Sequence, residues 1–119
     1  KTPVFVKGVI NLRGKIIPVI DLRTKFKIPS QDYNDRTSIV IIKLKSGDTE
    51  IYIGIIVDKV LEVLDINHKE IENTPKFGVH LDTEYILGMA KVKNKVVILL
   101  NINRVLTEEE LIMMDTENN

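Results

Sequence analysis

The stretch GVINLRGKIIPVIDL, residues 8–22, decides how the rest of the chain is interpreted. Two short apolar runs rich in β-branched residues, Val6–Leu12 and Ile16–Leu22, are typical of strands. Arg13 and Gly14 separate the runs, and a glycine at that point predicts a tight strand–turn–strand. Arg13 is then either a solvated turn residue or a cation presented to a partner, a role that suits the arginine side chain.

Two more pairs of apolar runs predict hairpins. SIVIIKLK and TEIYIGIIV flank a Ser-Gly-Asp turn at 46–48, and YILGMAKVK and KVVILLNI flank Asn94. Pro18 lacks a backbone donor, so we expect its strand to lie at a sheet edge or to be bulged there. Asp58–Ile66 is ambiguous, but its valines and its short length favour a strand. The polar residues 23–37 are interpreted as a loop.

Helical signals are few. Asn67 predicts one capped helical turn, in which its side chain bonds the amide at position 70. Thr107 and Glu110 have the spacing of a capping box and predict a helix over Glu108–Asp115. Many short strands with one terminal helix indicate a small β-barrel or sandwich.

Composition excludes several functional classes. The 119 residues suit one domain or two very small ones, and acidic and basic residues are equal at 17 each. A neutral chain gains no counterion release on a polyphosphate, so nucleic acid is not an expected partner. Anionic membrane surfaces are disfavoured for the same reason. Disulfides and thiolate chemistry are excluded because the sequence has no cysteine. No apolar run approaches the ~20 residues of a membrane span.

The sequence contains no convergent set of catalytic groups. The only two histidines, His68 and His80, are 12 positions apart and have no metal-binding spacing. We interpret both as solvated loop residues. Asp21, Asp58 and Asp65 follow or interrupt strands, where solvated strand ends or turn caps are the ordinary roles. We therefore expect no enzyme activity, no metal and no cofactor.

A resemblance adds to these inferences. FVKGVINLRGKIIPVIDLRTKF is similar to the signature of the CheW-like domain family, the coupling proteins of bacterial chemotaxis. YNDRTSIVII, GIIVDKVLEVLDI, FGVHLDTEYILGMA and VVILLNINRVLTEEELIMMD resemble the matching family segments in the same order. The similarity covers essentially the whole chain.

The resemblance implies an all-β fold with a short C-terminal helix, built as two SH3-like β-barrel subdomains. Residues 1–36 would be the remainder of the first barrel, 37–103 the second barrel, and 104–119 the helix and tail. The family normally carries two further strands before the point where this sequence starts, and without them the first barrel would be incomplete. Either those residues exist and are not shown, or another chain or a rearranged segment fills the gap. Strand exchange between two copies would be one such solution.

The family is non-catalytic and needs no cofactor. Its members are scaffolds, or adaptors, that couple the cytoplasmic tip of chemoreceptors to the regulatory domain of the histidine kinase CheA. The resemblance implies these two partners here. It also implies a cytoplasmic location at membrane-associated receptor arrays, without membrane insertion.

Six positions align with the family's receptor-facing groove: Arg13, Gly8, Thr37, Gly54, Val60 and Val63. Arg13 matches the arginine of the family's N-L-R-G motif, which is associated with receptor coupling. Val60 and Val63 would form the apolar floor of the groove or belong to the core. Gly8 and Gly54 would allow close approach or form strand bulges, and we favour the structural role.

The resemblance also implies a kinase contact in the loop after the helical turn, at the positions of Glu72, Lys76 and Phe77. Phe77 is the best candidate anchor because it is an aromatic residue in a polar loop, unless it folds back onto the barrel. Family members carry different charges at the positions of Glu72 and Lys76, which indicates tuning to a particular partner.

Two alternatives stay open. The chain is either free-standing, as the tail MMDTENN favours, or a CheW-like module of a larger chemotaxis protein, such as the kinase regulatory domain or a receiver fusion. The second alternative is a small RNA-binding β-barrel. Neutral charge and only six aromatic residues argue against RNA binding.

Overall fold

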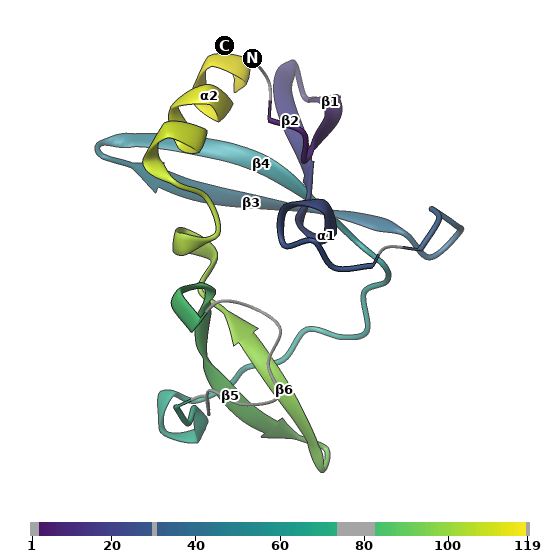
Figure 1. Ribbon diagram of the computed structural model, residues 1–119, viewed down its shortest axis with the longest axis vertical. Coiled ribbons are helices and arrows are strands. Elements are labelled where there is room, and N and C mark those ends of the chain that lie inside the picture. Colours follow the sequence, from purple (N-terminus) through teal and green to yellow (C-terminus); the bar gives the residue numbers. More distant parts are fainter. Residues whose placement is uncertain (1–2, 30, 74–82, 119) are drawn as a thin grey trace. The chain divides into compact units, whose positions relative to one another are not determined.

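The computed structural model describes residues 3–29, 31–73 and 83–118. Most of the regular structure is β, and one helix lies at the C-terminal end (Figure 1). The chain divides into two compact units, which are described separately. Unit 1 comprises Lys1–Leu61 and Thr107–Asn119, and unit 2 comprises Glu62–Leu106. The described part of the chain has no helix that is long and apolar enough to span a membrane.

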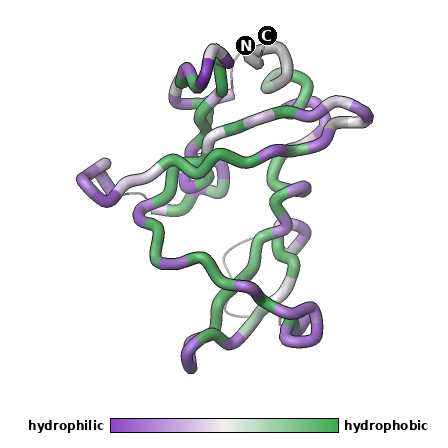
Figure 2. Tube along the Cα trace, turned by 180° about the vertical axis from the view of Figure 1, so that it is seen from behind, coloured by the Kyte–Doolittle hydropathy of each residue, from purple (hydrophilic) through white to green (hydrophobic). Residues whose placement is uncertain are grey.

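Unit 1 is built on a four-stranded sheet with the order β1-β2-β4-β3. Its strands are β1 (Val6–Leu12), β2 (Lys15–Asp21), β3 (Ser38–Ser46) and β4 (Thr49–Val57). The two antiparallel hairpins, β1–β2 and β3–β4, are those that the sequence predicts. They are joined by a short parallel pairing between β2 and β4. The tube in Figure 2 is hydrophobic along these strands and hydrophilic at their turns.

The β1–β2 turn contains two residues, because Leu12 pairs with Lys15. Arg13 and Gly14 have φ values of 54° and 84°, the signs that a type I′ turn requires at both central positions. Asn11 Oδ1 accepts a hydrogen bond from the Gly14 amide at 3.1 Å. The sequence thus closes the turn with its own side chain and leaves Arg13 exposed.

Pro18 is not at a sheet edge, which corrects the expectation. Its strand β2 lies between β1 and β4, and the bulge of this hairpin falls between Val6 and Gly8. The β2–β4 ladder begins at Val19, directly after the proline. The strand therefore pairs on its second side only beyond the residue that lacks a donor.

Helix α2 (Glu108–Asn118) packs on the sheet of unit 1, contacting β2 and β4. Thr107 and Glu110 form the predicted capping box, with bonds of 3.1 and 2.8 Å. The helix continues three residues past its predicted end. Leu111 and Met114 are buried, as their helical spacing indicates. Each such side chain contributes about 1.5–3 kcal/mol on burial, so this face anchors the helix.

The sheet side of this core consists of buried apolar residues from β2, β3 and β4: Ile17, Val19, Ile20, Leu44, Ile51, Ile53, Ile55 and Ile56. A second attachment of α2 is ionic. Lys25 Nζ lies 2.7 and 2.9 Å from the two carboxylate oxygens of Glu110. Lys25 belongs to a short helix, α1 (Leu22–Lys25), which begins at the last residue of the predicted second apolar run and continues into the segment interpreted as a loop.

The segment Asp58–Ile66 is not a strand, so that prediction is wrong. Strand β4 ends at Val57, which pairs with Ser38, the first residue of β3. Residues beyond Val57 have no strand residue of β3 opposite them and leave the sheet. Valine-rich composition favours a strand only where a ladder partner exists, and β3 begins only at Ser38, so it offers no partner to residues beyond Val57.

Unit 2 contains the predicted hairpin of β5 (Ile86–Val92) and β6 (Lys95–Leu100), closed by Lys93 and Asn94 at φ values of 52° and 65°. Three short 3-10 helices accompany it: η1 (His68–Glu70), η2 (Thr83–Tyr85) and η3 (Ile102–Arg104). Asn67 caps η1 as predicted: its side chain accepts from the Glu70 amide in a capping box, and its Oδ1 also accepts from the Lys69 amide at 3.2 Å.

Candidate interaction surfaces

Arg13 lies beside a shallow hollow at the tip of the β1–β2 hairpin. The hollow is lined by Leu12, Arg13, Lys15, Ile17, Ile41 and Tyr52. Lys15 Nζ stands 4.6 Å from the centre of the Tyr52 ring, which is a cation–π contact. Within residues 3–29, 31–73 and 83–118, no carboxylate forms an ion pair with Arg13. The site therefore combines an apolar wall with a cation that can bind an incoming acceptor.

Gly8 and Gly54 share one row of the sheet. Val19 pairs with Gly8 on one side and with Gly54 on the other. Gly54 is buried, and a Cβ atom at this position would stand 2.8 Å from Ile39 Cγ2 and 3.4 Å from Val19 Cγ2. The absence of a side chain at Gly54 thus lets the neighbouring side chains close over it.

Thr37 and Val60 lie at the end of the sheet that is opposite to the Arg13 turn, since Thr37 directly precedes β3 and Val60 follows the last residue of β4. Thr37 closes a turn with Asn34, because its Oγ1 accepts from the Asn34 amide at 2.8 Å and its own amide donates to the Asn34 carbonyl at 3.0 Å. Val60 is 56% exposed. A hollow joins the two segments and is lined by Asp35, Arg36, Ser38, Lys59, Val60 and Leu61.

The predicted receptor-facing residues do not form a single cluster. Because β2 and β4 run parallel with Val19 opposite Gly54, the Arg13 turn lies near the start of β4. Thr37 precedes the residue opposite Val57, at the end of β4. Arg13 and Thr37 therefore stand at opposite ends of the sheet. Val63 is 93% exposed and belongs to unit 2.

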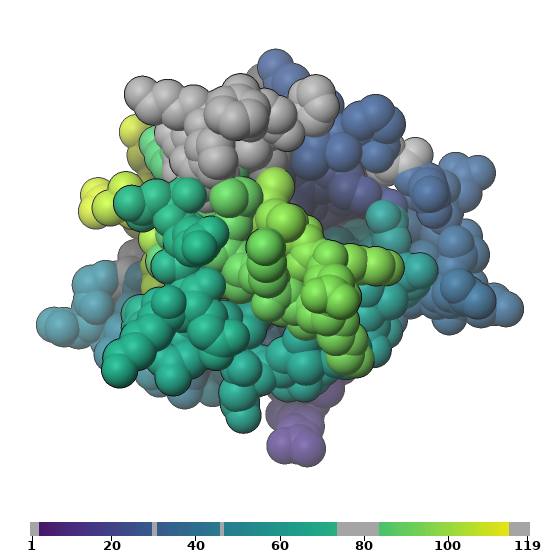
Figure 3. All heavy atoms as spheres, turned by 90° about the horizontal axis from the view of Figure 1, so that it is seen from below, coloured from purple at the N-terminus to yellow at the C-terminus, as the bar shows by residue number. Residues whose placement is uncertain are grey.

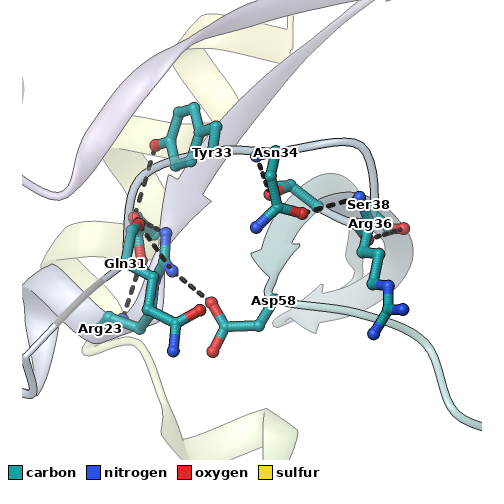
Figure 4. Close-up of polar contacts among 9 residues, drawn as sticks. Arg23, Gln31, Tyr33, Asn34, Arg36, Ser38 and Asp58 are labelled. Atoms are coloured by element: carbon teal, nitrogen blue, oxygen red, sulfur yellow. Dashed lines mark hydrogen bonds and ion pairs between the residues drawn. The ribbon is translucent and has the colours of Figure 1, made fainter.

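An ionic cluster that the sequence analysis did not find lies at the Thr37 end of the sheet (Figure 4). Asp21 and Arg23 form a two-pronged pair: Nε donates to Oδ1 at 3.0 Å and Nη2 to Oδ2 at 2.9 Å. The exposed fraction is 12% for the Arg23 side chain and 4% for the Asp21 side chain. Asp21 also caps α1 by accepting from the Arg23 amide at 2.9 Å. Asp21 therefore acts as a cap, which was one of the two roles expected for it, but its side chain is buried and not solvated.

The cluster sets the charge state of Asp21. Hydrogen bonds from the Arg23 side chain lower the pKa of the Asp21 carboxyl, although its burial opposes that shift. The same pairing raises the pKa of the Arg23 guanidinium. The third guanidinium nitrogen, Nη1, donates to Asp58 and to the Gln31 carbonyl, the latter at 3.3 Å. The Tyr33 hydroxyl donates to Asp21 Oδ2 at 3.4 Å.

The signal for this cluster is the shared end of two parallel strands. Asp21 is the last residue of β2 and Asp58 directly follows β4, and parallel strands end at the same edge of a sheet. The cation between them, Arg23, is two residues from Asp21. The sequence does not show that β2 and β4 are parallel, so the three residues could not be brought together from spacing alone.

Unit 2 carries the described part of the predicted kinase contact. Glu72 exchanges two backbone hydrogen bonds of 2.8 Å with Met89 of β5. The space-filling view in Figure 3 shows atoms of the segment 62–72 and of the β5–β6 hairpin at one face of this unit. Lys76, Phe77 and His80 lie outside the described residues. His68 is exposed on η1.

The described residues contain no group of three or more His, Asp or Glu side chains placed to hold a metal ion. What they offer is a set of binding features: a presented arginine, an exposed apolar segment and two hollows. This combination is typical of a protein-interaction module.

Comparison with known proteins identifies the module. The model of the CheW-like domain matches residues 1–110, so the chain belongs to the CheW-like domain family. The chemotaxis protein CheW of Klebsiella aerogenes is 41% identical over 114 residues, which cover 96% of this chain and 66% of that protein. The chemotaxis protein CheW of Bacillus subtilis is 38% identical over 106 residues, covering 88% and 65%.

A solved structure agrees with this assignment. The crystal structure of the scaffolding protein TtCheW from Thermoanaerobacter tengcongensis superposes with a TM-score of 0.75 at 36% identity. The match covers 90% of this chain and 66% of that one. The chain therefore spans about two thirds of the length of these relatives.

Proposed function

We propose that the chain acts as a non-catalytic adaptor of bacterial chemotaxis, which joins the cytoplasmic tip of a chemoreceptor to the regulatory domain of the histidine kinase CheA. The observation that carries the proposal is the family match over residues 1–110. Two relatives are named as chemotaxis proteins and a third as a scaffolding protein, which supports a scaffold here. The adaptor works in the cytoplasm, at membrane-associated receptor arrays.

The complete adaptor consists of two SH3-like barrels, with residues 1–36 in the first, 37–103 in the second and 104–119 as the helix and tail. This division rests on the family resemblance, since the described sheet joins β1–β2 and β3–β4 in the order β1-β2-β4-β3. The outer sides of β1 and β3 are open in that sheet and can accept a further strand. That strand comes from additional residues of the protein or from a second copy by strand exchange.

The receptor contact divides into two kinds of residue. Arg13, Thr37, Val60 and Val63 touch the receptor helices, with the valines as apolar floor and Arg13 as the charged residue that fixes the register. Gly8 and Gly54 act indirectly by shaping the sheet, as the buried position of Gly54 favours.

The kinase contact uses Glu72, Lys76 and Phe77. Glu72 is exposed, and its two backbone bonds to Met89 fix its position beside β5, so its side chain is accessible to a partner. Phe77 supplies the apolar anchor, and the two charged residues tune the choice of partner.

An adaptor must bind both partners at once, which gives a direct experiment. The protein is mixed with a receptor-tip helical hairpin and the isolated CheA regulatory domain, and complexes are measured by analytical ultracentrifugation. We expect a ternary complex that contains all three components. Two binary complexes that exclude each other would contradict the adaptor function.

A further inference from the structure

The Arg23 guanidinium joins three parts of the chain: the end of β2 at Asp21, the loop at Gln31, and the segment that begins at Asp58. Nε and Nη2 bind Asp21 at the end of β2, and Nη1 donates to the Gln31 carbonyl and to Asp58. The two-pronged bond to Asp21 fixes the plane of the guanidinium. The direction of Nη1 is thereby fixed as well, so both of its acceptors are held relative to the sheet.

Each acceptor precedes, in the sequence, the residues that form one wall of the hollow beside Val60. Asp58 directly precedes the wall formed by residues 59–61, and Gln31 precedes the wall formed by Asp35, Arg36 and Ser38. The second wall is connected to the cluster through Tyr33, whose ring centre lies 5.7 Å from the guanidinium carbon. The turn closed by Asn34 and Thr37 then leads into the wall (Figure 4).

The two halves of the cluster differ in what they can contribute. The Asp21 side chain is buried and the Arg23 side chain is 12% exposed, and an ion pair with a buried carboxylate is costly to break. The Asp58 side chain is 53% exposed, and such pairs add little to global stability. Because Asp58 begins a segment without ladder partners, its bond to Arg23 affects mainly where that segment lies.

We propose that Arg23 is a positioning residue, which holds the two walls of the Val60 hollow at a fixed separation and thereby sets the affinity for the receptor helix. This inference rests on the proposed function, which supplies the occupant of the hollow. It assigns to Arg23, Asp58 and Tyr33 a role in binding although none of them needs to touch the partner.

The test uses Asp58→Asn, because this variant leaves the buried Asp21–Arg23 pair intact. Glu50→Gln is the matched control. Like Asp58, Glu50 pairs with a cation, since its carboxylate lies 3.7 Å from Lys43 Nζ, and its side chain is 50% exposed. Both variants remove one carboxylate of similar exposure from unit 1. Nuclear magnetic resonance relaxation reports the backbone order of residues 31–37 and 59–61 in the free protein. Titration with a receptor-tip hairpin reports affinity.

We expect Asp58→Asn to lower the backbone order of both segments and to weaken hairpin binding about three- to fivefold, the upper part of the range for one exposed ion pair. Glu50→Gln should change neither. Unchanged affinity in Asp58→Asn, while the wild type binds, would overturn the inference and leave the adaptor function standing. Failure of the wild type to bind would instead overturn the adaptor function. In that case unchanged order in Asp58→Asn would also overturn the positioning role, and lowered order would support it.

Discussion

Gly54 lies so close to Ile39 that a Cβ atom at Gly54 would stand 2.8 Å from Ile39 Cγ2. Because that methyl group branches directly from the Cβ of Ile39, it cannot move aside as the end of a long side chain could. We predict that Gly54→Ala lowers the free energy of unfolding by about 1–3 kcal/mol, the cost of overpacking a core. Urea denaturation measures this change. An unaltered midpoint would show that the neighbouring side chains make room for the added methyl group, which would contradict the prediction.

Gly88 has a similar role in unit 2. A Cβ atom there would stand 2.6 Å from the Glu72 carbonyl oxygen, which accepts the Met89 amide. We predict that Gly88→Ala breaks this bridge and accelerates hydrogen exchange at the Glu72 and Met89 amides. Leu87→Ala is the control, since Leu87 is 50% exposed. Equal protection of both amides in the two variants would contradict the close packing.

Asp21 should make stability depend on acid pH. Its pKa lies below the ordinary value of 3.8, because Arg23 donates hydrogen bonds to the ionised carboxylate. The contribution of Asp21 to stability is therefore complete above about pH 4 and is lost as the pH falls through the lowered pKa. Asp21→Asn should lower the free energy of unfolding by about 3 kcal/mol at neutral pH, because it breaks an ion pair that has a buried carboxylate. On acidification, the variant should then lose less stability than the wild type does.

Urea denaturation between pH 2 and pH 6 checks this prediction. Asp48→Asn is the control, because Asp48 is an exposed turn residue. Parallel stability curves for the wild type and Asp21→Asn would show that the carboxyl does not titrate with folding.

Met114 should anchor α2 to the sheet of unit 1. Its side chain is fully buried, whereas Ile112 on the same helix is 62% exposed. We predict that Met114→Ala costs about 2–5 kcal/mol of unfolding free energy by leaving a cavity, and that Ile112→Ala costs much less. Calorimetric melting of both variants makes the comparison. Equal losses would mean that the helix does not dock by this face.

The hairpins and the last helix were predictable because their signals are local. A Gly-containing turn between two apolar runs, or Thr107 with Glu110, fixes its element without distant partners. The error at residues 58–66 has the opposite origin. Whether a valine-rich run becomes a strand depends on an available ladder, and Ser38 ends that ladder opposite Val57.

Non-local pairing also explains what was missed at the candidate site. The parallel contact of β2 with β4 makes β2 a central strand despite Pro18, and it brings Asp58 to Arg23. Neither result follows from spacing along the chain. The exposure of Arg13, in contrast, follows from the two-residue turn that its own sequence specifies.

The central claim is that Arg13 is presented to a chemoreceptor helix, and one titration tests it most directly. A receptor-tip hairpin is added to the wild type, to Arg13→Ala and to Lys93→Ala, and binding is followed by nuclear magnetic resonance. Lys93 is the control, because it too is a cation with positive φ at the first position of a two-residue turn. It differs from Arg13 in pairing with Glu62 at 2.8 Å. We predict at least about tenfold weaker binding for Arg13→Ala alone, the loss of one charge-assisted contact. Equal affinities for Arg13→Ala and Lys93→Ala, with both variants folded, would contradict the claim and leave Arg13 as a solvated turn residue.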